Sequence, residues 1–147
     1  MFITDQHRQQ IWQYFAEMDR CIGILQKVAA VPADQFRNDT ILQAAGERAL
    51  HIALECATDV GNLIIDALIM RDPSSYEDIV QVLAEENVFP QTFTKSFMEV
   101  VQFRRILAHE YLQRDVDRLY RMIAEHTGEF AQFQSYVADY VKLGSPA

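Results

Sequence analysis

The chain has 147 residues, half of them hydrophobic, which suffices for one substantial core and requires no second domain. We therefore expect a single domain over residues 1–147. Thirteen basic residues against 21 acidic ones give a net charge of −8, which excludes a protein that holds nucleic acid by bulk electrostatic attraction. Any contact with RNA should be local, at a small basic site.

Cysteine content and hydropathy indicate a cytoplasmic protein. The two cysteines, Cys21 and Cys56, lie in apolar helical surroundings, where reduced thiols pack as small hydrophobic side chains. The N-terminus becomes polar at once and lacks a signal-peptide core. The longest apolar stretch, residues 63–70, is short and is interrupted by Asp66, so we expect no membrane segment.

Helical periodicity dominates the first half of the chain. A first helix is predicted from about residue 4 to residue 28, ending before Pro32. Its apolar stripe consists of Ile11, Phe15, Met18, Ile22 and Leu25. A second helix, from about residue 39 to residue 70, is apolar over more than half its circumference, as expected for a helix at the centre of a bundle.

The second half of the chain predicts three further helices. Ser74 and Glu77 form a capping-box pattern that opens a short helix through Leu83. Pro90 suits the first turn of the next helix, and a last helix is expected over about 115–143. The prediction is an all-α fold, an antiparallel up-and-down bundle of four long helices plus one short helix.

The residues with the clearest chemistry lie at the end of the third long helix. Arg104, His109 and Tyr111 stand at fixed spacing there. An arginine can hold a phosphate and an imidazole can exchange a proton near neutral pH, so the pair suffices for phosphodiester cleavage without a metal. At about 100° per residue, Arg104 and His109 would point about 140° apart on a continuous helix, whereas Arg105 and His109 would share a face. Both arginines therefore remain candidates.

Together with a second segment, residues 47–62, this motif resembles the HepT-like toxin family of the HEPN superfamily. The family pattern is an arginine, four residues, a histidine, any residue and a tyrosine, and the resemblance covers nearly the whole chain. One departure is Arg105, since the family usually has a small polar residue, typically asparagine, at that position. The resemblance implies a HEPN-like bundle.

The resemblance also implies a function. The family members are metal-independent endoribonuclease toxins, with a homodimer whose cleft lies near the motif and a helix that ends or kinks near His109. Here His109 would move a proton at the 2′-hydroxyl or the leaving oxygen, and Arg104 would stabilise charge on the phosphate, with no cofactor and no metal. An MntA-like nucleotidyltransferase antitoxin would inactivate the toxin by transferring AMP to Tyr111.

A line of polar residues runs down the second helix at mostly four-residue steps: Glu47, His51, Glu55, Asp59 and Asn62. If this line faces the motif, Glu47 or Glu55 is expected to orient Arg104 or His109. Alternatively, Glu47, His51 and Glu55 would ligate a metal, although no matching ligand pair occurs on another helix.

Two other interpretations remain open. The acidic charge and Arg105 favour a non-catalytic interaction module that binds a nucleotidyltransferase partner or a nucleotide. In a purely structural interpretation, Arg104 pairs with an acidic neighbour such as Glu99 or Glu110, His109 caps the C-terminus of its helix and Tyr111 belongs to the core. The remaining histidines, His7 and His126, lie in polar surroundings and are expected to be exposed.

Overall fold

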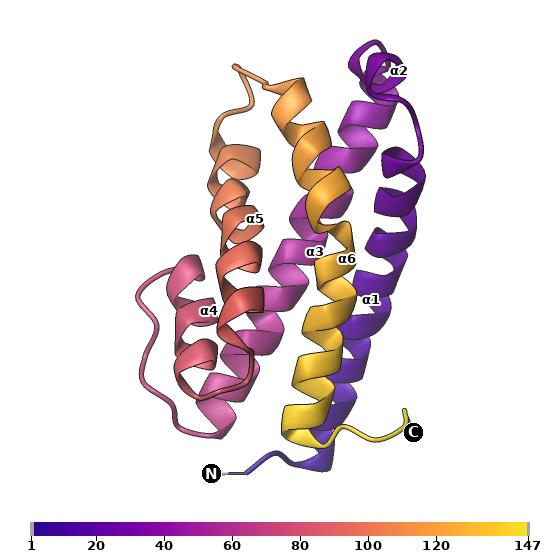
Figure 1. The fold of residues 1–147 in the computed structure, drawn as a ribbon. Coiled ribbons are helices and arrows are strands. Elements are labelled where there is room, and N and C mark those ends of the chain that lie inside the picture. The colour runs from indigo at the N-terminus through magenta and orange to yellow at the C-terminus, as the bar shows by residue number, and fades with distance from the viewer. Residues whose placement is uncertain (1, 147) are drawn as a thin grey trace.

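The computed structural model describes residues 2–146, and all of its regular structure is helical. The helices are α1 (Asp5–Ala29), α2 (Ala33–Arg37), α3 (Thr40–Ala67), α4 (Tyr76–Glu85), α5 (Gln91–His109) and α6 (Val116–Val141). Helices α1, α3, α5 and α6 run alternately up and down and form the bundle, while α4 lies beside α3 and α5 (Figure 1). The predicted fold class is confirmed.

The core is built from the apolar stripes of the four long helices. Helix α3 is central, since it contacts α1, α4, α5 and α6. Phenylalanines of α5 and α6 fill the middle, with Phe97 and Phe133 stacked at 5.7 Å between ring centroids and Phe130 edge-on to Phe97. Burying one such ring contributes about 1.5–3 kcal/mol to folding. The predicted stripe of α1 is buried except for Ile22, which is half-buried because Cys21 occupies the innermost position beside it.

Both cysteines are buried and free, as predicted. Burial raises the pKa of the Cys56 thiol to about 12, with smaller contributions from Cys21 and nearby acidic groups. Burial likewise raises the pKa of Cys21. At neutral pH both side chains are therefore uncharged and pack as small hydrophobic groups.

The start of α4 differs from the predicted capping box. Ser75, not Ser74, is the N-cap residue, and its hydroxyl accepts a hydrogen bond from the backbone N–H of Asp78 at 3.1 Å. The Asp78 carboxylate in turn accepts the backbone N–H of Ser74 at 2.9 Å. Asp78 therefore fills the capping role predicted for Glu77. Glu77 points toward α5 instead, where it lies 3.7 Å from Arg105.

A single arginine fixes the connection between α3 and α4. The Arg71 guanidinium donates to both oxygens of Asp78 at 2.8 Å and to both oxygens of Glu85 at 2.9 and 3.1 Å. The hydrogen bonds from Arg71 hold the pKa of Asp78 well below its usual range. The connection is thus clamped onto α4 along most of that helix.

Helix α2 was not predicted from the sequence. It is a single turn whose one buried side chain, Phe36, packs against the ring of Tyr120 at 5.2 Å. The buried Gln43 amide donates to the carbonyl oxygens of Phe36 and Arg37, at 2.9 and 3.0 Å, so the end of α2 is satisfied by a side chain of α3. A turn this short leaves no helical periodicity in the sequence.

The expectation that His126 is exposed is wrong. Only 2% of this residue is accessible, because it faces the interior between α6 and α5. Its Nδ1 lies 2.7 Å from Oε1 of Glu129, which supplies the polar partner that makes such burial tolerable. His7 is half-buried rather than exposed, since its Nδ1 accepts the backbone N–H of Thr4 at 3.1 Å and closes the capping box of α1.

No helix among the described residues is both long enough and apolar enough to cross a membrane.

Candidate functional site

The sequence motif lies at the end of α5. Helix α5 continues without interruption to His109 and ends there, with the backbone N–H of Glu110 bonded to the Ile106 carbonyl oxygen at 3.0 Å. The helix end expected near His109 is therefore present. Tyr111 follows in the connection to α6, residues 110–115.

Arg104 is held firmly by residues of two other helices. Its Nε lies 2.9 Å from Oε1 of Glu55 on α3, and its guanidinium carbon lies 3.6 Å from the centre of the Tyr76 ring at the start of α4. Its side chain is 21% exposed. Within residues 2–146 no hydrogen bond engages the two terminal guanidinium nitrogens, so they can still bind an anion.

Glu55 organises this cluster. Besides Arg104 it lies 3.3 Å from Nε2 of His51, and it accepts a hydrogen bond from the Tyr76 hydroxyl at 3.3 Å. Burial, and next the charge of Glu55, raise the pKa of Tyr76, which keeps its hydroxyl protonated as a donor. The polar line on α3 does face the motif, and Glu55 orients Arg104 as one of the predicted arrangements requires.

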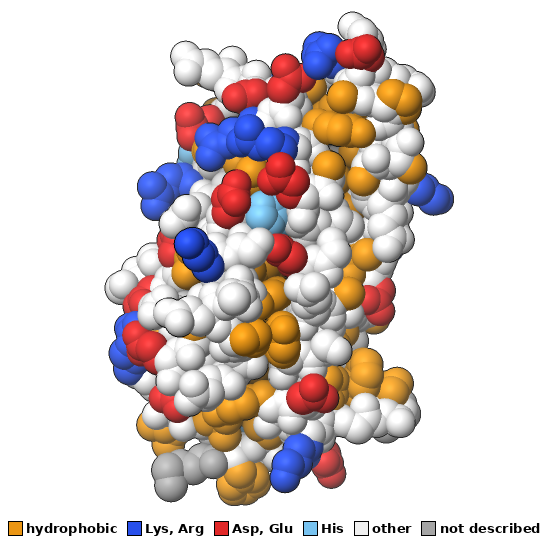
Figure 2. All heavy atoms as spheres, viewed as in Figure 1, with side chains coloured by type: hydrophobic (Ala, Val, Ile, Leu, Met, Phe, Trp, Pro, Cys, Tyr) orange, Lys and Arg blue, Asp and Glu red, His pale blue; other side chains and the backbone are white. Residues whose placement is uncertain are grey.

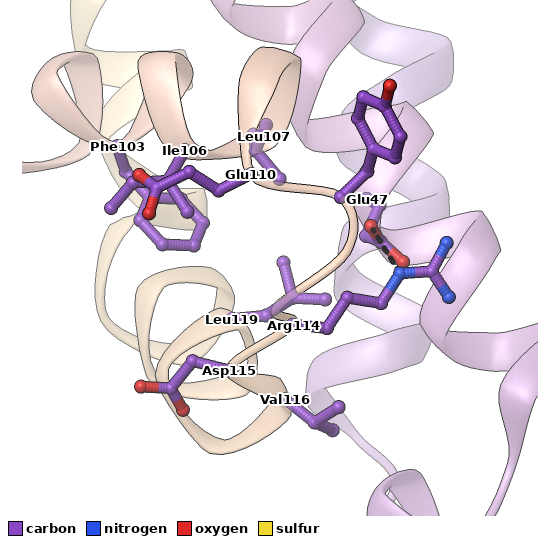
Figure 3. Close-up of a pocket in the computed structure, with 10 residues that line it drawn as sticks. Glu47, Phe103, Ile106, Leu107, Glu110, Arg114, Asp115, Val116 and Leu119 are labelled. Atoms are coloured by element: carbon purple, nitrogen blue, oxygen red, sulfur yellow. Dashed lines mark ion pairs between the residues drawn. The ribbon is translucent and has the colours of Figure 1, made fainter.

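Glu47 contacts neither Arg104 nor His109. Its carboxylate lies 3.7 Å from Nε of Arg114, in the connection that carries Tyr111 (Figure 3). Figure 3 also shows Arg114 reaching across to Glu47 on α3, whereas Glu110 lies on the other side of the connection, over Phe103 and Ile106. Glu47 therefore positions the connection rather than the motif arginine.

Arg105 lies on the outer side of α5. Its side chain is 72% exposed, and its nearest acidic partner is Glu77 of α4 at 3.7 Å. Arg105 and Arg104 thus differ in kind, since Arg105 is a solvated surface cation and Arg104 is fixed in place by neighbours.

His109 and Tyr111 are exposed and engage no other side chain of residues 2–146 in a hydrogen bond. Tyr111 is 64% accessible, so its predicted place in the core, under the structural interpretation, is wrong. Arg104 does pair with an acidic side chain, as that interpretation expects, but the partner is Glu55 and not Glu99 or Glu110. Because α5 is continuous from Gln91 to His109, the five-residue spacing sets Arg104 and His109 about 140° apart around the helix axis.

The surface beside the motif has two hollows. The first, of about 30 Å³, lies under the connection between α5 and α6 and is too small for a nucleotide. The second, an open depression of about 210 Å³, lies between α3 and that connection and is lined by Ala44, Glu47, Arg48, His51, Leu107 and Arg114. Two arginines, Arg48 and Arg114, make this depression locally basic in an otherwise acidic molecule.

The polar line on α3 does not form the metal site considered from the sequence. The Glu55 carboxylate is occupied by the Arg104 guanidinium, and Glu47 is turned toward Arg114. Asp59 is largely exposed, and the partial desolvation of its carboxyl group, followed by the charge of Glu55, raises its pKa. The three residues Glu47, His51 and Glu55 therefore serve different contacts.

Tyr76 is the residue of this cluster that sequence reasoning missed. It stands at the first position of α4, with no regular spacing to Arg104 in the chain, and reaches the arginine only because α4 folds back onto α3 and α5. No periodic or motif signal in the sequence points to such a contact.

An up-and-down helical bundle with an arginine, a histidine and a tyrosine at the end of its third long helix defines a protein of the HEPN superfamily. Residues 18–137 match the family model described as Ribonuclease HepT-like, and the chain belongs to this family.

The relatives agree with this assignment. The chain is 34% identical to the putative RNase YutE of Bacillus subtilis over 128 residues, which cover 86% of this chain and 89% of YutE. It is 28% identical to the mRNA nuclease HepT of Shewanella oneidensis over 118 residues, which cover 80% of this chain and 88% of that nuclease.

Solved structures show the same fold. The structure of YutE, described as a cytosolic protein of unknown function, superposes with a TM-score of 0.84 at 28% identity, covering 100% of this chain and 99% of YutE. The tri-AMPylated HEPN toxin of Shewanella oneidensis, solved in complex with its MNT antitoxin, superposes with a TM-score of 0.80 at 26% identity, covering 88% of this chain and 97% of the toxin.

Proposed function

We propose that this protein is the toxin of a toxin–antitoxin pair and acts in the cytoplasm as a metal-independent endoribonuclease. The observation that carries the proposal is the state of Arg104, which Glu55 and Tyr76 fix at 2.9 and 3.6 Å while its terminal nitrogens stay free. A preorganised cation of this kind stabilises charge that develops on a phosphate without rearranging during the reaction.

His109 supplies the proton transfer. Its imidazole is exposed at the end of α5, and no acidic side chain of the described residues engages it. It accepts the proton of an RNA 2′-hydroxyl, whose oxygen attacks the adjacent phosphorus, and a proton returned to the departing 5′-oxygen completes the cleavage. Side chains supply every step of this transfer, so the reaction requires no metal.

The active form is a homodimer. Within one chain Arg104 and His109 diverge by about 140°, so one RNA phosphate does not reach both from a single protomer. A second copy placed against the end of α5 brings the arginine of one protomer toward the histidine of its partner. Leu112, directly after Tyr111, is 88% exposed and supplies apolar surface for this contact.

Tyr111 is the site of control. An exposed phenol in a connection between helices is open to a nucleotidyltransferase antitoxin, and its oxygen attacks the α-phosphate of ATP with release of pyrophosphate. The AMP so attached places a negative phosphate beside Arg114, which lines the basic depression, so it blocks RNA and offsets the charge that binds it. The AMPylated relative bound to its MNT antitoxin supports this proposal.

The decisive experiment is cleavage of a mixed-sequence RNA by protein whose intact mass shows no AMP, in the presence of chelator. We expect cleavage that His109→Ala abolishes, because the proposed proton transfer depends on this imidazole. His7→Ala, a histidine at the far end of the bundle, is the matched control and should leave cleavage intact apart from a small loss of stability.

The second candidate function is a non-catalytic module that binds a nucleotidyltransferase partner. The ion pair between Arg104 and Glu55 favours it, since that contact already neutralises much of the arginine's charge. Unmodified dimeric protein that binds its partner tightly and leaves RNA intact would select this function over the nuclease.

A further inference from the structure

A second cluster of ionisable side chains lies away from the motif, on the face formed by α5 and α6. It consists of His126 and three glutamates, Glu99 from α5 and Glu125 and Glu129 from α6. Figure 2 shows acidic side chains gathered around a histidine on this face, below the basic side chains near the end of α5 and the start of α6. The proposed nuclease reaction uses none of these residues.

Only one of the two ring nitrogens of His126 has a hydrogen-bond partner. Nδ1 lies 2.7 Å from Oε1 of Glu129, whose other oxygen accepts a hydrogen bond from the Ser96 hydroxyl. Nε2 is buried, in a side chain only 3% exposed, and has no hydrogen-bond partner. A buried polar atom without a partner costs about 1–3 kcal/mol, so its retention calls for a physical reason.

Two carboxylates lie close to the unpartnered Nε2 of His126. Oε2 of Glu99 lies 3.6 Å from Nε2 and Oε2 of Glu125 lies 4.0 Å from it, too far for a hydrogen bond. One ligand atom from each of the three residues lies within 4.8 Å of the others. Ligands about 2.0–2.2 Å from a tetrahedral zinc ion stand about 3.4 Å apart, so small rotations of two half-exposed glutamates bring the set to bonding geometry.

The negative charges of the three glutamates are also not balanced by a basic side chain among the described residues. In the described part of the chain, neither Glu99, Glu125 nor Glu129 forms an ion pair with a lysine or an arginine. Three carboxylates around one imidazole repel one another, and a divalent cation relieves that repulsion. As a carboxylate, Glu129 favours the tautomer in which Nδ1–H donates a hydrogen bond to it, and this tautomer leaves the Nε2 lone pair facing the two other carboxylates.

We propose that His126, Glu99 and Glu125 form a binding site for a divalent transition-metal ion of the zinc type, with Glu129 positioning the histidine. A carboxylate behind a metal-bound histidine is the usual arrangement in zinc proteins. The ion joins α5, which carries the motif, to α6, and water completes its coordination. The site goes beyond the proposed function, because the ion is bound away from Arg104 and His109 and takes no part in RNA cleavage.

The first test is a titration of chelator-stripped protein with Zn²⁺, followed by calorimetry. Wild type should bind one ion per chain at this site. The double variant Glu99→Gln with Glu125→Gln should lose more than about 100-fold in affinity, since even partners of metal ligands contribute about 10- to 100-fold. Both glutamates are half-exposed, so the double variant retains its fold.

The matched control removes two exposed carboxylates elsewhere on the molecule, Glu86→Gln with Asp139→Asn. It changes the net charge equally and should bind Zn²⁺ as wild type does. Zn²⁺ should also raise the melting temperature of wild type and control, and not that of the Glu99 and Glu125 double variant.

The second test locates the ion by NMR of the histidine rings. Without metal, the His126 ring, recognised by its absence in His126→Gln, should carry its proton on Nδ1, and Zn²⁺ should shift the Nε2 resonance. Binding that survives the double variant, or a proton found on Nε2 in the metal-free protein, overturns the proposal. These outcomes are independent of RNA cleavage, so they leave the nuclease proposal untouched.

Discussion

Glu55 decides how Arg104 is presented. A guanidinium on a long side chain is ordinarily mobile, and the conformational entropy lost when it is fixed must be offset by other interactions. Here the contacts with the Glu55 carboxylate and the Tyr76 ring provide that offset in the absence of substrate. The guanidinium is therefore preorganised, although its ion pair with Glu55 offsets part of its charge.

Replacing Glu55 by glutamine should separate these two effects. The amide keeps the shape but removes the charge that anchors Arg104, so we expect kcat for RNA cleavage to fall by about 10- to 100-fold through misplacement of the guanidinium. KM should stay unchanged or fall, because the loss of a negative charge favours RNA binding. Steady-state cleavage of a fluorogenic RNA measures both.

Asp59→Asn is the matched control for Glu55→Gln. Asp59 lies one turn further along α3, is exposed and forms no ion pair among the described residues, so its variant should cleave as wild type does. Equal losses in both variants would mean that the net charge, and not the orientation of Arg104, controls the rate.

At the scale of elements, the close approach of α4 to α3 depends on Gly61. A Cβ atom at this position would lie 2.5 Å from Cγ2 of Ile79 and 3.3 Å from Cδ1 of Leu83. The first distance is far inside van der Waals contact, and Ile79 is buried with little room to move. Helix α4 would have to shift, and with it Tyr76 at its first turn.

We therefore expect Gly61→Ala to lower the free energy of unfolding by about 1–3 kcal/mol through overpacking. Gly23→Ala is the control, since no atom lies within 4 Å of its Cβ position, and the gain in helix propensity should raise stability by about 0.5–1 kcal/mol. Urea unfolding followed by circular dichroism measures both. Equal stabilisation of the two variants would contradict the packing argument.

The long helices and the polar line on α3 were predictable because each repeats a simple spacing many times. Glu55 shares a helix face with His51, and that face had to meet another element. Other features were not predictable, because they depend on what lies opposite. Tyr76 reaches Arg104 only through the fold, and Phe36 anchors a turn too short for periodicity.

His126 illustrates the same limit. Its neighbours in the chain are polar, so the sequence predicts exposure, yet α5 covers the ring and brings Glu99 to it. The partner that makes its burial tolerable, Glu129, lies three residues away on the same helix, and one turn of helix is the only local signal for it.

At the scale of the whole molecule, the proposed dimer rests on the acidic charge and on the divergence of the two motif residues around α5. A protein with a net charge of −8 repels RNA at long range, so the cations of the site must act together at short range. A dimer that pairs two motif ends doubles the local basic groups without changing the sign of the rest of the surface.

Leu112→Glu should therefore convert the dimer to a monomer and abolish cleavage together, because it buries a charge in the proposed contact. Ile69→Glu is the control, since Ile69 is also largely exposed, at 69%, but lies after α3 at the opposite end of the bundle. Sedimentation velocity over a range of concentrations gives the oligomeric state. A dimer that persists in Leu112→Glu would place the interface elsewhere.

The two arginines of the interhelical connections have opposite consequences for proteolysis. Trypsin must draw several residues of extended chain into its cleft, and Arg71 resists this because four hydrogen bonds bind it to α4. Arg114 has a single contact of 3.7 Å, to Glu47, so digestion of the native protein should begin in the connection after α5. An enzyme that modifies Tyr111 must likewise pull this connection into its own active site, and the sparse anchoring of the segment allows it to do so without unfolding the bundle.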